Sequence, residues 1–451
     1  MSGDIAMLYT NKDLRKLIIP LVFEQLLAIL VGMVDTVMIA GVGEAAVSGV
    51  SLVDTINILI INITAALATG GAVVAGHYLG QKDSANASRS AWQLVLFSIW
   101  LSLAVTIIFL ALHKPMLRGI FGQVEPEVME NAATYLVITA VSICPLAIYN
   151  ACAALFRAMS DSKTTMLIAI AMNLINLIGN AILIYGAKIG VAGAAIATTF
   201  SRVVAAVIIM ALMFHGGKAI SFQGQATWKP DFRLIKKILY IGIPNGLENS
   251  LFQLGKILLL SLVSTLGTYA IAANAVCNTL ASFNVLPGSA VNLALLSVAS
   301  MCIGAGDFKQ ARYYTRKLMM IAIGCTALIS GVLFVFAPWV MKIYQLTPQT
   351  ESLAVQVIRW HTVLAVIFWV PSFSLPNTLR AAGDVVWTMF IAIASMWIFR
   401  IAFAYLFSVR FHGGLMGVWI AMTIDWAFRS ICYFARYHGH KWEKAMLSSK
   451  V

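Results

Sequence analysis

Charged residues are scarce in this sequence, and acidic residues are the scarcest. Only 18 of the 451 residues are Asp or Glu, and all charged residues together make up 11%, whereas 60% are hydrophobic. The mean hydropathy is +0.87, which excludes an ordinary soluble domain, in which about a quarter of the residues are charged. The composition therefore predicts a membrane protein.

Several signatures of other protein classes are also missing. The six cysteines lack the paired spacing of a metal site or a secreted disulfide framework, so we expect packing residues. There is no GxxxxGK[ST] loop, which argues against ATP coupling, and no HExxH motif or Ser, His and Asp set placed for hydrolysis. We therefore expect a protein that is not an enzyme and has no cofactor. The polar start, MSGDIAMLYTNKDLRK, does not read as a signal peptide.

Long apolar segments recur along the chain, separated by short polar loops. Only helices fit such lengths, because lipid offers no partner to backbone groups. We predict an all-α membrane protein with twelve transmembrane helices, at 14–40, 49–79, 89–113, 128–155, 163–186, 190–214, 235–266, 269–303, 311–337, 350–377, 384–409 and 413–437.

Lysine and arginine are distributed unevenly over the loops. Counted by alternate loops and span ends, 22 fall on one side, and five fall on the other: Lys114, Arg118, Lys188, Lys342 and Arg410. The positive-inside rule then places both termini in the cytoplasm of a plasma membrane of the bacterial inner-membrane type. The net charge of +13 thus indicates the topology and is compatible with contact to anionic lipid, and we expect no nucleic-acid partner.

The two halves of the chain repeat each other. A shift of 224 positions superposes Pro20 on Pro244 and Glu24 on Glu248, and also pairs the glycines and aspartates at 43 with 267, 80 with 304 and 83 with 307. A shift of 223 superposes Arg157 on Arg380. We predict a six-helix lobe at 1–214, a cytoplasmic linker at 215–234 and a second six-helix lobe at 235–451, related as a parallel repeat around a central cleft.

The first apolar segment, 20–40, contains two acids, Glu24 and Asp35. On a helix they lie about 20° apart in azimuth, so they share one face. An ionised side chain in hydrocarbon costs several kcal/mol, so this face should meet a protein interior or a wet cavity. The two acids are therefore a functional-site hypothesis.

A resemblance now emerges from motifs spread over nearly the whole chain. They are MVDTVMIAGVGEAAVSGVS at 33–51, AGHYLGQKD at 75–83, FRAMSDSKTT at 156–165, NLINLIGNAILIYG at 173–186, GVAGAAIATT at 190–199 and LRAAGDV at 379–385. In order and spacing the chain resembles the multidrug and toxic compound extrusion (MATE) family, cation-coupled exporters with twelve helices in two lobes.

The resemblance implies a cation-coupling site at Asp35, Asn176, Asn180 and Thr198, and a second-lobe carboxylate at Glu248. Asn180 departs from the family pattern, because many members have an aspartate there, and the acid that some members have in the tenth helix is absent. Independently, Asn176 and Asn180 share a helix face. Carboxylate and amide oxygens can hold Na⁺, and a desolvated carboxylate can hold a proton. The alternative is a polar network that only joins helices.

Four further residues are candidates for a substrate cleft. Glu24 and Glu248 are related by the repeat and could meet a cationic substrate, although Glu24 could instead pair locally and order its helix. Lys256 and Arg400 should lie inside the second lobe, where Arg400 matches Asn176 of the first repeat and could replace a bound cation. Their alternative role is internal ion pairing that holds the bundle together, with Arg400 as one candidate partner of Glu248.

These observations favour a secondary active multidrug exporter. We expect it to couple efflux of amphipathic, cationic compounds to inward movement of H⁺ or Na⁺ by alternating access, and to work as a monomer in contact with membrane lipid. The main rival is a flippase for lipids or polyprenyl-linked precursors, which should show a cationic cavity. A passive channel is a second rival, which the lobed repeat disfavours.

Overall fold

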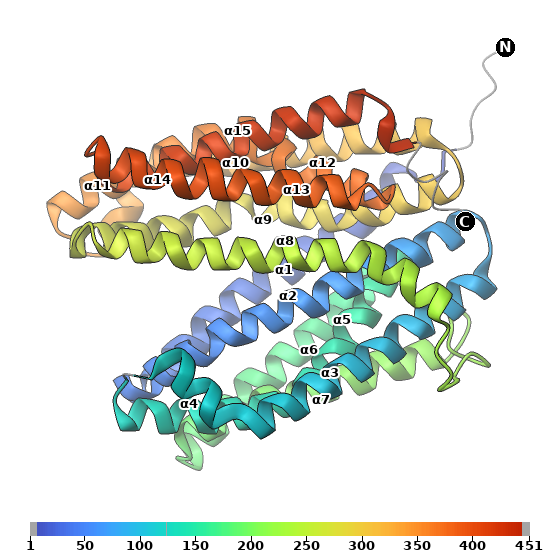
Figure 1. The fold of residues 1–451 in the computed structure, drawn as a ribbon, viewed down its shortest axis with the longest axis horizontal. Coiled ribbons are helices and arrows are strands. Elements are labelled where there is room, and N and C mark those ends of the chain that lie inside the picture. The colour runs from blue at the N-terminus through green and yellow to red at the C-terminus, as the bar shows by residue number, and fades with distance from the viewer. Residues whose placement is uncertain (1–6, 123, 444–451) are drawn as a thin grey trace. The chain divides into compact units, whose positions relative to one another are not determined.

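The structure is a computed structural model that describes residues 7–122 and 124–443. Every regular element in these two ranges is a helix (Figure 1). By its contacts the chain divides into two compact units, which we call the first and the second unit. The first unit is Arg15–Gly246, and the second unit runs from Leu247 onward and includes the start of the chain up to Leu14.

The first unit is built from seven α-helices, one π-helical segment and the beginning of an eighth α-helix. They are α1 (Asn11–Ala40), α2 (Glu44–Gly80), α3 (Ser84–Phe121), α4 (Pro126–Val141), α5 (Ile143–Ala158), α6 (Ser162–Asn180), η1 (Ala181–Gly186), α7 (Gly190–Phe214) and the first part of α8 (Phe232–Ser264). Its core lies where α2 packs on α4 and α5, around Val53, Ile60 and Leu136.

The second unit continues α8 and adds the remaining helices. They are α9 (Thr268–Gly304), α10 (Phe308–Ile343), α11 (Pro348–Leu364), η2 (Ala365–Trp369), α12 (Val370–Ala381), α13 (Val385–Ser395), η3 (Met396–Ala402), α14 (Phe403–Tyr405), η4 (Leu406–Arg410) and α15 (Gly414–His438). Its core joins α8, α9, α11 and α15 around Leu262, Cys277 and Trp419.

The predicted spans are all helical, and this is a multi-pass membrane fold. Ten helices of the described ranges are long and apolar enough to cross a membrane, and the pair α4 and α5 raises the number to eleven if it is one span. The span predicted at 235–266 is α8, which is not among these helices because its centre carries polar residues such as Asn245, Glu248 and Lys256. Its length of 33 residues still exceeds the thickness of a bilayer.

Two details differ from the prediction. The span predicted at 128–155 is interrupted at Ser142, where α4 and α5 meet at 49°. Pro145 explains the break, because it lacks the N–H that a continuous helix would use. The linker predicted to end at 234 already becomes helix at Phe232, because Asp231 accepts the first backbone N–H groups of α8.

The repeat is visible in the turns within each unit. Residues with positive φ recur at matching places: Gly43 and Gly267, Lys82 and Gly306, Ser160 and Gly383, Lys188 and His412, and Gly190 and Gly414. The last two have φ of 59° and 53°, a left-handed conformation that glycine adopts without strain. The two halves thus use the same turn chemistry between matching helices.

Aspartates begin matching helices as well. Asp83 accepts the N–H of Asn86 at 3.0 Å, and Asp307 accepts that of Gln310 at 2.9 Å. Asp161 caps α6 through Thr164 and also binds the Lys218 ammonium at 2.5 Å. Burial acts to raise the pKa of Asp161, but the bonds from Lys218 and Thr164 outweigh it and hold this pKa below its ordinary value.

Glycine allows one close helix contact in the first unit. A Cβ on Gly70 of α2 would collide with the carbonyl oxygen of Ile238 and would lie 2.9 Å from the backbone nitrogen of Gly242, both on α8. In the second unit a Cβ on Gly255 would meet side-chain atoms, chiefly the flexible end of Met396 and, at 3.2 Å, Cδ1 of Ile401. Backbone atoms cannot move aside as a methionine side chain can, so glycine is required more strictly at position 70 than at position 255.

Candidate functional site

The residues predicted to couple a cation lie together in the first unit. Asp35 comes from the last turns of α1, Asn176 and Asn180 from the end of α6, and Thr198 from α7. Asn180 is the last α-helical residue before η1, and π-helical turns are frequent at functional sites. The 3.6-residue period brings both asparagines to the face that meets Asp35.

The Asp35 carboxylate is held by two amides. Asn180 Nδ2 donates to Asp35 Oδ1 at 2.9 Å. With its nitrogen toward Asp35, Asn176 donates to Oδ1 at 3.0 Å and to Oδ2 at 3.1 Å, while its own oxygen accepts from Thr198 Oγ1 at 3.1 Å. All four predicted residues therefore form one hydrogen-bonded cluster.

The buried polar atoms of this cluster need hydrogen-bond partners or a bound ion. Asn176 and Asn180 are 6% and 1% exposed, and Asp35 is half-buried. Asn180 Oδ1 is buried and has no hydrogen-bond partner among the residues that the structure describes. A carboxylate with an unused amide oxygen beside it offers the oxygen ligands that Na⁺ prefers, and a single carboxylate can equally take up a proton.

A second polar group lies beside the cluster and includes one residue that sequence reasoning missed. The hydroxyl of Tyr135, on α4, is hydrogen-bonded to Thr198. Asp54 accepts from Asn57 and attracts the guanidinium of Arg202, which donates to Ser142 Oγ at 2.7 Å. The period of α4 gave no reason to single out Tyr135, because an apolar helix face accommodates a tyrosine equally well.

Glu24 has a local partner rather than an open position. Its Oε1 lies 3.4 Å from Arg157 Nη1, and its Oε2 accepts from Thr165 Oγ1 at 3.0 Å. The side chains of Glu24 and Arg157 are only 13% and 17% exposed. This favours the local role expected for Glu24, in which it orders its helix, and its partners are Arg157 and Thr165.

Glu248 pairs with Arg380, the residue that the repeat relates to Arg157. Arg380 Nη2 lies 2.7 Å from both oxygens of Glu248, and Arg429 Nη2 lies 3.8 Å from Oε1. Arg157 and Arg380 superpose under the repeat, as do Glu24 and Glu248, so each unit pairs the same acid with the same arginine. Arg400 is therefore not the partner of Glu248.

Arg400 instead pairs with Asp425. Its Nη1 lies 3.5 Å from Asp425 Oδ2, and Ser395 donates to the other carboxylate oxygen. Lys256 places its ammonium 5.1 Å from the ring centre of Phe252, and the Arg400 guanidinium lies 5.0 Å from the same centre. The structure thus brings Lys256 and Arg400 together on one aromatic ring.

No metal cluster accompanies these groups. Within 7–122 and 124–443, no three His, Cys, Asp or Glu side chains gather as metal ligands.

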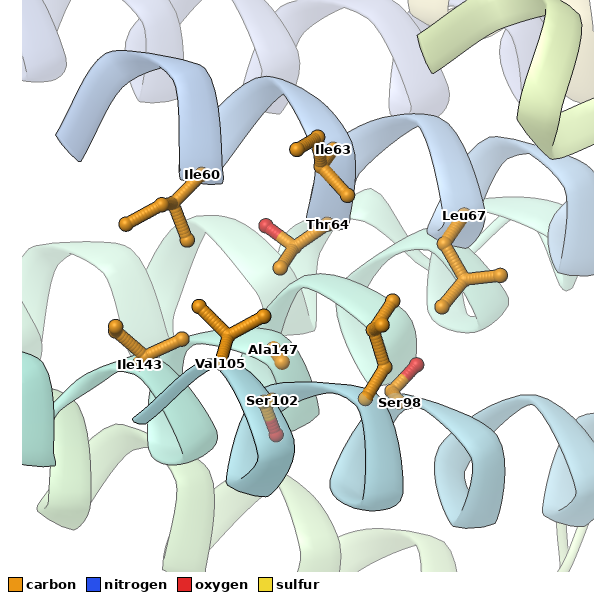
Figure 2. A pocket seen from close by; sticks show the side chains of 10 residues that line it. Ile60, Ile63, Thr64, Leu67, Ser98, Ser102, Val105, Ile143 and Ala147 are labelled. Atoms are coloured by element: carbon orange, nitrogen blue, oxygen red, sulfur yellow. The ribbon is translucent and has the colours of Figure 1, made fainter. Parts of the chain in front are cut away.

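A small cavity also lies in the first unit (Figure 2). It measures about 30 Å³ and is lined by apolar side chains such as Ile60, Leu67 and Val105 and by the hydroxyl-bearing Thr64 and Ser102. Figure 2 shows side chains of α2 and α3 facing each other across it. That volume accommodates about one water molecule, so this cavity is not a drug-sized binding site.

A family model and related proteins match the sequence of this chain over most of its length. The family model described as MatE matches twice, at residues 20–182 and 244–406, and the two matches begin and end 224 residues apart. This is the shift at which the sequence repeats itself.

Relatives and solved structures give the same result. The chain is 26% identical over 435 residues to "Uncharacterized transporter YisQ" of Bacillus subtilis, covering 94% of this chain and 93% of that protein. It is also 26% identical over 442 residues to "Probable multidrug resistance protein NorM" of Thermotoga maritima, covering 96% and 93%. The crystal structure of a MATE protein in complex with MaD3S superposes with a TM-score of 0.89 at 21% identity, covering 97% of this chain and 96% of that one.

Proposed function

Because the chain belongs to the MATE family of membrane transporters, we propose that it exports amphipathic, cationic compounds in exchange for inward movement of H⁺ or Na⁺. The observation that carries this proposal is the Asp35 carboxylate held by the amides of Asn176 and Asn180. The relatives named as multidrug resistance proteins support a multidrug substrate range.

Asp35 couples the ion to the transport cycle through the donors that face it. Asn176 and Asn180 both donate N–H groups to this carboxylate, an arrangement that suits its ionised form. Binding H⁺ displaces at least one of these donors, whereas binding Na⁺ requires amide oxygens such as Asn180 Oδ1 to turn toward the ion. Either event rearranges α1 against α6.

An ion can drive alternating access only if it binds the two conformations with different affinities. A rearrangement of Asp35, Asn176 and Asn180 supplies such a difference, because the amides cannot at once hold the empty carboxylate and coordinate the ion. A tenfold difference in ion affinity corresponds to about 1.4 kcal/mol of bias between the states.

We propose that the chain works as a monomer in the plasma membrane. Both termini then lie in the cytoplasm, because lysine and arginine concentrate on that side. Membrane lipid is then its surrounding partner, and the chain needs no cofactor other than the coupling ion.

Asp35→Asn tests the coupling role. In proteoliposomes loaded with a cationic dye, an imposed gradient of pH or of Na⁺ should drive efflux by the unaltered protein, and one of the two gradients should suffice. Asp35→Asn should remain folded but lose gradient-driven efflux. Glu130→Gln, which changes an exposed acid at α4, is the matched control and should transport normally. Normal coupled efflux by Asp35→Asn would refute the assignment.

The flippase remains the second candidate, because Lys256 and Arg400 lie together in the second unit. A labelled lipid in the same proteoliposomes separates the two functions. Gradient-dependent dye efflux without lipid translocation supports the exporter, and lipid translocation without ion exchange supports the flippase.

A further inference from the structure

The second unit contains more positive than negative charge in one connected network. The network consists of the basic groups of Arg380, Arg400, Arg429 and Lys256 and the carboxylates of Glu248 and Asp425. Arg429 links its two parts, because its guanidinium is attracted by both Glu248 and Asp425. Four positive charges thus face two negative ones, an excess of two. A network whose only purpose was to hold helices together would pair its charges, because an unpaired buried charge is costly.

Arginine donors of this network, and the indole N–H of Trp426, which follows Asp425 in the chain, are unsatisfied. Arg400 Nε, Arg429 Nε and Nη1, and Trp426 Nε1 are buried without a hydrogen-bond acceptor in the part of the chain that the structure describes. The three residues are only 8%, 2% and 3% exposed. Each such group carries a free-energy penalty until an acceptor reaches it.

Lys256 lies at the accessible side of the network. Its side chain is exposed, its ammonium lies over the ring of Phe252, and no carboxylate partner for it occurs in ranges 7–122 and 124–443. Arg400 approaches the same ring at 5.0 Å. An accessible cation beside a buried one and an aromatic face can receive a charged head group and the apolar body attached to it.

The repeat shows that these charges are not part of the shared scaffold. Under the shift of 224, Lys256 superposes on Gly32 and Arg400 on Asn176, both of which are uncharged. The fold therefore forms without positive charge at these positions in the first unit. Their presence in the second unit calls for a role specific to that unit.

We propose that Lys256, Arg400 and Arg429 form a binding site for the anionic head group, a carboxylate or phosphate, of an amphipathic molecule that the transporter moves. Lys256 meets the head group first, Arg400 and Arg429 supply the buried donors, and Phe252 packs on the apolar body. The inference rests on the proposed transport function and extends its substrates to amphiphiles that carry a negative charge, including zwitterions.

Equilibrium binding tests the site without any ion gradient. The full chain in phosphatidylcholine nanodiscs is titrated with radiolabelled naphthoate and, separately, with naphthamide, which has the same ring but no charge. Naphthoate should bind more tightly. Lys256→Gln and Arg400→Gln should each weaken naphthoate binding by about 10-fold to 100-fold, as expected for loss of a charge-assisted hydrogen bond, and should leave naphthamide binding unchanged.

Lys236→Gln is the matched control, because it removes an exposed lysine from the same helix. If Arg400→Gln does not fold, Lys256→Gln and Lys256→Glu still decide the question, and Lys256→Glu should prefer a naphthyl ammonium compound. Unchanged naphthoate affinity in the Lys256 variants, or an equal loss for naphthamide, overturns the proposal.

A lipid head group is the other source of the same chemistry. In nanodiscs of phosphatidylglycerol, weaker naphthoate binding that disappears in Lys256→Gln identifies the lipid phosphate as an occupant of the site. Naphthoate affinity that does not depend on the lipid identifies the site with free substrate. Because no gradient is used, failure here leaves the Asp35 coupling test standing, and failure of that test leaves this one.

Discussion

The paired charges of Glu248 and Arg380 predict a large and unequal effect of two related substitutions. Both oxygens of Glu248 lie 2.7 Å from Arg380, and Arg429 lies 3.8 Å away. The three side chains are 8%, 11% and 2% exposed. Glu248→Gln leaves two guanidinium groups without their carboxylate, whereas Arg380→Gln leaves Glu248 with Arg429.

The magnitude follows from this geometry. Removing one partner of a buried ion pair costs about 3–5 kcal/mol, so Glu248→Gln should lie in that range and Arg380→Gln below it. The matching pair Glu24 and Arg157 makes one contact at 3.4 Å and is more exposed, so its coupling energy should be about 1–2 kcal/mol, between buried and exposed pairs.

Double-mutant cycles measure the two coupling energies. Unfolding in detergent is followed by titration with sodium dodecyl sulfate for each single variant, each double variant and the unaltered protein. The pair in the second unit should give the larger coupling energy. Equal coupling energies, or a Glu248→Gln variant as stable as the unaltered protein, would refute the reasoning from bond geometry.

Three further predictions concern stability. Gly70→Ala should destabilise the protein by about 1–3 kcal/mol, because the added methyl group overpacks against backbone. Gly255→Ala should cost less, because the side chain of Met396 can move. Unfolding titrations compare the two variants, and equal losses of stability would contradict the argument. Asp161→Ala should cost about 1 kcal/mol through loss of the helix cap, and Asp161→Asn should cost less, since asparagine also caps. Because the pKa of Asp161 is lowered, its ion pair with Lys218 stabilises the fold at neutral pH. This stabilisation is lost as the pH falls through the lowered pKa. Ala147→Val should fill the cavity of about 30 Å³ and raise stability by up to roughly 0.7 kcal/mol, and a loss of stability would show that the cavity cannot take the methyl groups.

The helices and the grouping of Asp35, Asn176 and Asn180 could be predicted from the sequence because both depend on period and depth, whereas Thr198 was implied only by the family resemblance. Asp35 had to face an interior, and Asn176 and Asn180 share a helix face by spacing alone. The structure places these three residues and Thr198 in one hydrogen-bonded group. Whether that group couples an ion stays a prediction for the transport assay.

Partners that come from distant helices were harder to predict. Glu248 and Arg380 lie 132 residues apart, and periodicity says nothing about which helices adjoin. A signal was nevertheless present: the repeat superposes Glu24 on Glu248 and Arg157 on Arg380, and an acid and an arginine conserved between two halves of one chain suggest an ion pair. Pro145 likewise signalled the break between α4 and α5.

The start of the chain packs on helix α10 of the second unit. The backbone N–H of Leu8 donates to Gln310, 302 residues later, and that of Tyr9 donates to Tyr314, 305 residues later. At a synthesis rate of about 5–20 residues per second, the ribosome needs roughly 15–60 s to deliver these partners. The segment around Leu8 and Tyr9 therefore cannot dock on α10 until long after its own synthesis, when its partners have been made.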